Sequence, residues 1–92
     1  MEILEQVAND LKVEKEVLAR NSLGVFLRKE LNDVEAEMFK ITARHGIKTV
    51  TEFDKLLKDG KVLEEDVIDD FMELDYFESR REELLNALEK IK

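Results

Sequence analysis

The sequence has no cysteine and no proline, and it has glycine at only three of its 92 positions. Without cysteine, the chain has no disulfide, no thiolate ligand for zinc and no thiol nucleophile. Without proline, and with glycine only at positions 24, 46 and 60, few residues interrupt a helix. Histidine occurs once, so metal-binding patterns that pair it with a second histidine are absent. From these absences we predict a non-catalytic protein without a cofactor.

No run of apolar residues approaches the length of a membrane span, and the first residues, MEILEQ, are acidic where a signal peptide is basic. We therefore expect a cytoplasmic protein that does not bind a membrane. Lys and Arg number 15 against 23 Asp and Glu, which gives a net charge of −8 at pH 7. Because DNA, RNA and anionic lipids repel such a chain, direct nucleic-acid binding is disfavoured and a basic protein is the better-matched partner.

The pattern of residues predicts a single all-α domain over residues 1–92. Gly46 suits the left-handed residue that ends a helix, and Thr49 with Glu52 forms a capping box that begins another. No segment has a convincing strand pattern. The predicted elements are short N-terminal helices within residues 1–20, a long helix over 22–45, a short connecting helix over 49–59 and a long helix over 63–91.

The first long helix carries uncharged residues on two opposite sides. One stripe has the alternating spacings of a coiled-coil seam and must face a partner helix; its residues are Leu27, Leu31, Val34, Met38, Ile41 and His45. A second stripe, here called the uncharged face, consists of Val25, Asn32, Ala36, Phe39 and Ala43. Two coverings are open. The N-terminal helices fold back over this face, or another chain packs against it as a homodimer or heterocomplex.

The second long helix contains the stretch DDFMELDYFESRR at residues 69–81, where its apolar side rotates. The early apolar arc is wide enough to cover both the first long helix and the short helix, whereas the later arc needs one neighbour. We expect the two long helices to form an antiparallel hairpin, which brings Arg81 near Leu31 and Glu30 and can dimerise into a helical bundle. Four residues of the second helix should be largely buried: Phe71, Leu74, Phe77 and Leu84.

Four carboxylates share one side of the second long helix and form the acidic stripe: Asp66, Asp69, Asp70 and Glu73. This stripe is either a solvated face or a docking surface for a basic partner. It can hold a divalent cation firmly only with ligands from elsewhere, so no metal ligand is assigned. His45 lies in the last turn of the first long helix, where positive charge complements the helix dipole, and it is assigned no catalytic role.

The segment from about Phe26 to Leu88 reads LRKELNDVEAEMFKITARHGIKTVTEFDKLL and then DDFMELDYFESRREELLNAL within it. This pattern resembles a group of small archaeal helical proteins, some of which are similar to antitoxin-like partners of toxin-like proteins. The resemblance implies a helical partner protein, and residues 1–21 lie outside it. Its most particular residues are Asp70, Phe71, Leu74, Asp75, Glu78, Arg80 and Arg81.

Two classes of function remain open from the sequence. The first is a non-catalytic protein–protein interaction module that binds through the uncharged face and, in the antitoxin-like case, masks a basic protein with the acidic stripe. The second is a small metal-dependent enzyme that uses carboxylates carried on helices. An acidic mimic of nucleic acid is a further alternative. The arrangement of the acids in the folded chain distinguishes these hypotheses.

Overall fold

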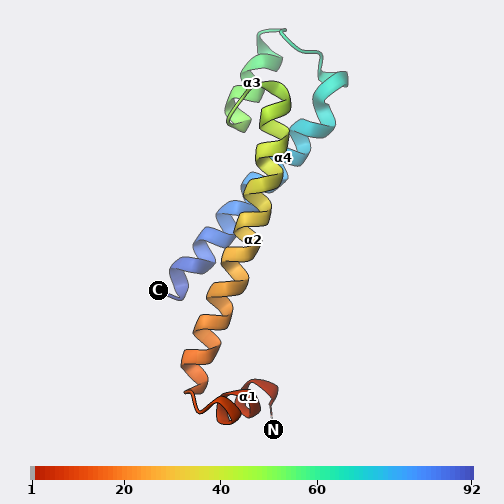
Figure 1. The fold of residues 1–92 in the computed structure, drawn as a ribbon. Helices are drawn as coiled ribbons and strands as arrows, with labels where there is room; N and C mark the ends of the chain where they lie inside the picture. The colour runs from red at the N-terminus through yellow and green to blue at the C-terminus, as the bar shows by residue number, and fades with distance from the viewer. Residues whose placement is uncertain (1) are drawn as a thin grey trace.

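The computed structural model describes residues 2–92, which fold into four helices (Figure 1). The helices are α1 (Ile3–Leu11), α2 (Lys15–His45), α3 (Val50–Lys58) and α4 (Glu64–Lys90). Residues 2–92 contain no β-strand. The prediction of an all-α protein is therefore confirmed.

Helix α2 is longer than the sequence predicted, and the expected start near Ser22 is wrong. The helix begins at Lys15 and continues for 31 residues, so the short helix expected to end at Arg20 is its first part. The break lies earlier, at Lys12, whose backbone is left-handed with φ 59°. Relative to alanine, a serine inside a helix lowers the stability of the helix by only roughly 0.5 kcal/mol. Ser22 alone therefore does not end or begin a helix. No proline follows to stop it.

Helices α2 and α4 pack side by side over most of their lengths (Figure 1). His45 at the end of α2 contacts Asp70 near the start of α4, and Arg20 near the start of α2 contacts Ile91 at the end of α4. The buried residues between them include Ile41, Leu74 and Leu84. The first turn of α2 and all of α1 therefore project beyond the end of α4, as Figure 1 shows.

Helix α3 covers the other end of the long helices. Gly46 ends α2 with φ 64°, as predicted from its position. The Thr49 hydroxyl then accepts a hydrogen bond of 3.1 Å from the Glu52 backbone N–H, which begins α3 as the capping box predicts. Phe53 on α3 is completely buried, and its ring centroid lies 5.7 Å from that of Phe71 on α4. The best-packed core is therefore at the α3 end.

Burial along α4 is graded. Leu74 and Leu84 are buried, whereas Phe71 and Phe77 pack against the core and stay partly accessible. Two helices side by side cover one side of each other and leave their flanks open, and α3 covers the flank only near its own end. All four side chains are thus largely covered, as expected, and the two phenylalanines less completely than the two leucines.

The molecule is a rod of 60 × 19 × 19 Å with a radius of gyration of 19.1 Å. A compact chain of this length has a radius of gyration of about 12 Å. Many large apolar side chains are exposed along the rod, on all helices except α3. An elongated shape with exposed apolar residues is typical of a protein that buries part of its surface against another chain.

Candidate interaction surface

The uncharged face is open along α2. All five of its residues are exposed, and Phe39 and Val25 retain 72% and 66% of their accessible surface. These residues lie on the side of α2 away from the buried Val34 and Ile41, which pack toward α4. The helix therefore presents a stripe without charge that no part of the described chain covers.

The N-terminal helix does not cover this stripe, so one of the two predicted coverings is wrong. Helix α1 crosses the far end of α2, as Figure 1 shows, and buries Ala8 there. Lys15 and Glu2 form an ion pair of 3.3 Å across the corner. The left-handed Lys12 turns α1 across the axis of α2 instead of back along it. The other predicted covering, a second chain, stays a prediction.

Most of the charged residues beside the uncharged face are paired within the chain. Lys29 contacts Asp33 at 2.8 Å and Lys40 contacts Glu37 at 3.1 Å, each one helical turn apart. The hydrogen bond to Asp33 raises the pKa of the Lys29 ammonium above its ordinary value of 10.5, so this lysine stays charged at neutral pH. On the other flank, Glu35 pairs with an arginine of α4 at 3.6 Å. The surroundings of the face are thus close to neutral in a chain of net charge −8.

The arginine on that flank is Arg81, which was expected near Leu31 and Glu30. Its actual partner, Glu35, is 3.6 Å away. A hollow of about 570 Å³ lies beside this pair and reaches the uncharged face at Phe39 and Ala43. Apolar atoms of Met38 form part of its lining. A side chain from another molecule can therefore enter next to Phe39.

The acidic stripe is divided in the folded chain. Asp66, Asp69 and Glu73 are exposed on α4, as predicted. The side chain of Asp70 is only 26% exposed, because its Oδ2 lies 2.8 Å from His45 Nε2 and its Oδ1 lies 3.5 Å from Arg44. Asp70 therefore joins α4 to the end of α2 and is the least accessible of the four carboxylates.

His45 is held between this carboxylate and the core. Its ring centroid lies 4.6 Å from that of Phe53 on α3, so the side chain connects three helices. Its position in the last turn of α2, where the helix dipole favours positive charge, agrees with the sequence prediction. Among residues 2–92, no three His, Asp or Glu side chains are grouped so that they could hold a metal ion.

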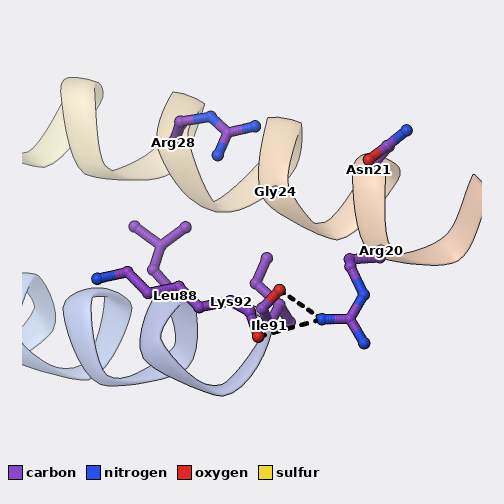
Figure 2. Close-up of a pocket in the computed structure, with 7 residues that line it drawn as sticks. All are labelled: Arg20, Asn21, Gly24, Arg28, Leu88, Ile91 and Lys92. Atoms are coloured by element: carbon purple, nitrogen blue, oxygen red, sulfur yellow. Dashed lines mark hydrogen bonds between the residues drawn. The ribbon is translucent and has the colours of Figure 1, made fainter. Parts of the chain in front are cut away.

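A contact missed by the sequence analysis closes the opposite end of the long-helix pair (Figure 2). The Arg20 guanidinium donates hydrogen bonds to the backbone oxygens of Ile91 at 2.6 Å and Lys92 at 3.4 Å. These oxygens lack partners in the helix, and a cation satisfies them well. The sequence analysis placed Arg20 on a separate short helix and therefore did not place it on α2. Arg20 lies seven residues before Leu27, one heptad, with no helix-breaking proline between them, and this spacing could have indicated a continuous helix.

Figure 2 also shows how Arg28 lies beside Gly24 at the same contact. A Cβ at position 24 would lie 2.9 Å from the Arg28 guanidinium, so the glycine makes room for that group. Within residues 2–92, Arg28 has no carboxylate partner in an ion pair, in contrast to Lys29 and Lys40. The border of the uncharged face therefore contains one cation without a counter-charge.

A family model described as the Uncharacterized protein MJ0235 family matches residues 1–92. The chain belongs to this family. The Uncharacterized protein MJ0235 of Methanocaldococcus jannaschii is 29% identical over 76 residues, which cover 83% of this chain and 93% of that relative. The predicted resemblance to a small archaeal protein is thus confirmed. No solved structure matches the chain.

The family match extends over the whole of the rod, including α1 and the start of α2, which lay outside the resemblance found in the sequence. The antitoxin-like part of that resemblance stays a prediction. None of the helices formed by residues 2–92 combines the length and apolar character that a membrane span requires.

Proposed function

We propose that this protein is a non-catalytic interaction module in which the two long helices, as an antiparallel hairpin, present the uncharged face to another helical chain. The observation that carries the proposal is the exposure of Phe39, which keeps 72% of its surface in the centre of a stripe with heptad spacing. Removing one such side chain from water contributes roughly 1.5–3 kcal/mol to association. A helix of a partner matches the spacing of the stripe.

The acidic stripe supports a second contact in the same module. Asp66, Asp69 and Glu73 are exposed, and two large side chains beside them on α4, Met72 and Tyr76, each keep 62% of their surface. Acidic groups around apolar side chains match a basic partner, which is the chemistry of the antitoxin-like role. The enzyme and nucleic-acid-mimic alternatives stay predictions, because no further observation favours either.

The test uses the tagged full chain as bait in extracts of its source cells, with two glutamate variants. Phe39→Glu places a charge in the uncharged face, and the matched control Ile3→Glu places one on α1, where the side chain is equally exposed at 72%. Proteins that the wild type and Ile3→Glu capture and Phe39→Glu loses, and that rebind as purified components, support the proposal. If Phe39→Glu captures and rebinds the same proteins as the wild type, the uncharged face is not the interaction surface.

A further inference from the structure

We infer that the uncharged face binds a second copy of this chain, with the two α2 helices parallel and in register. The inference rests on the proposed function, since it names the partner of the same face. Three features of the folded chain support it: the amount of excess surface, the local balance of charge and the placement of polar residues around the heptad stripe.

The exposed surface exceeds that of a compact protein by an amount that fits a dimer. The chain exposes 6978 Å², whereas a compact protein of 10.8 kDa exposes about 5,500 Å². The excess, about 1,400 Å², is larger than the roughly 800 Å² that each partner buries in a standard interface. The rod can therefore lose a full interface and still expose the surface expected of a folded protein.

Charge favours a copy of the same chain at this face. Two chains of net charge −8 repel each other over most of their surfaces. The uncharged face is an exception, because it has no charge and the ion pairs of Lys29 and Lys40 neutralise one border. A strongly basic partner gains nothing from such a surface. A second copy meets like charge there only at Lys29, whose ammonium is paired with Asp33.

The residues flanking the stripe determine the direction of the second helix. In heptad terms Val25, Asn32 and Phe39 occupy d positions and Ala36 and Ala43 occupy a positions. In a parallel pair, each g residue faces an e residue five positions later on the other helix. Arg28 then faces Asp33 of the second copy, and Glu35 faces Lys40 of the second copy. Both contacts join opposite charges, and the first provides the counter-charge that Arg28 lacks in its own chain.

The stripe itself also suits a parallel pair in register. Asn32 meets Asn32 of the second copy, where the two amides can hydrogen-bond, and such a pair typically fixes coiled-coil register. Phe39 meets Phe39, and the small Ala36 and Ala43 on either side leave room for the rings. One charge, Lys29, falls at an a position. Its long side chain reaches Asp33 at the border of the face, so its ammonium need not be buried.

The absence of cysteine from the chain allows a direct test of register. Facing d positions bring the Cα atoms within the ~4.4–6.8 Å range that a disulfide spans. We expect purified Asn32→Cys to form a covalent dimer on mild oxidation, and the matched control Asn86→Cys, on an exposed part of α4, to remain uncrosslinked. If Asn32→Cys crosslinks no more than Asn86→Cys while the protein is dimeric, the parallel register is wrong.

Light scattering of the wild type from about 1 to 100 µM tests the second copy itself. The expected molar mass is twice that of the chain at the upper concentration. We expect Phe39→Glu to weaken dimerisation at least about 30-fold and the control Ile3→Glu, on the exposed side of α1, to leave it unchanged. A monomeric wild type at 100 µM would overturn the inference. The capture experiment then decides the proposed function separately, because Phe39-dependent binding of a different protein would leave it standing.

Discussion

Arg20 near the start of α2 donates a hydrogen bond of 2.6 Å to the backbone oxygen of Ile91, 71 positions later in the chain. At the other end of the helix pair, His45 contacts Asp70. One polar contact thus closes each end of the packing between α2 and α4. Apolar contacts, such as those of Leu74 and Leu84, have little directionality, so they alone would tolerate a shift of α4 along α2 by one helical turn. The two hydrogen-bonded contacts would be broken by such a shift, so they fix the register of the two helices.

Replacing Arg20 with alanine should loosen the end of α4. We expect a loss of about 1 kcal/mol in the free energy of unfolding, because hydrogen bonds to charged groups contribute more than neutral ones and this site is exposed. Amide hydrogen exchange should become faster over residues 86–92 and remain unchanged in α3. Arg20→Lys should recover part of the protection. Equal exchange in the wild type and Arg20→Ala would show that the contact does not hold the helix end.

Asp70 and Asp69 should respond differently to the same substitution. Asp70→Asn weakens the contact with His45 and should lower the free energy of unfolding by about 1–2 kcal/mol. Asp69 is exposed, so Asp69→Asn should change it by less than about 0.5 kcal/mol. Urea unfolding followed by circular dichroism measures both. Equal effects of the two variants would show that the contact of Asp70 with His45 does not stabilise the fold and that Asp70 is a solvated residue like Asp69.

The charge pair proposed across the dimer can be reversed. Arg28→Asp should weaken dimerisation. In each of the two equivalent contacts of the dimer, the new carboxylate at position 28 would face Asp33 of the second copy. The double variant Arg28→Asp with Asp33→Arg should restore at least part of the lost affinity. Sedimentation equilibrium provides the dissociation constants. Additive weakening in the double variant, with no recovery, would contradict the predicted pairing.

Two glycine-to-alanine changes should have opposite signs. At position 24, in the middle of α2, alanine should stabilise the fold by up to about 1 kcal/mol, since it favours helix and the Cβ meets only the mobile Arg28 guanidinium. At position 46, where φ is 64°, alanine should destabilise it by about 1 kcal/mol. Thermal unfolding of both variants tests the comparison. A destabilising Gly24→Ala would mean that the Arg28 position matters to the fold.

The sequence predicted helix ends correctly where a capping residue or a glycine marks the end. Gly46 and the Thr49–Glu52 capping box act within a few residues, and both have the predicted conformation. The start of α2 was placed at residue 22 instead of Lys15, although a serine costs little within a helix and does not by itself end one. The actual break, at Lys12, uses a left-handed conformation that is uncommon for lysine and has no signature in the sequence.

The candidate site could be predicted as a set of positions but not as an accessible surface. Heptad spacing identified the uncharged face from Val25 to Ala43, because periodicity depends only on the helix. Its exposure depends on the direction in which α1 leaves Lys12, which is a matter of tertiary structure. Asp70 shares the periodicity of its acidic neighbours, and only the position of His45, 25 residues earlier, distinguishes it.

The 60 Å length of the rod separates its two ends by more than the diameter of a small globular domain. A single small partner cannot touch α1 and α3 at once, so these ends can bind different molecules without steric interference. In a parallel pair, both copies of α1 lie at one end and both copies of α3 at the other. Each end would then offer two identical attachment points, and a ligand with two matching groups would bind there with enhanced avidity.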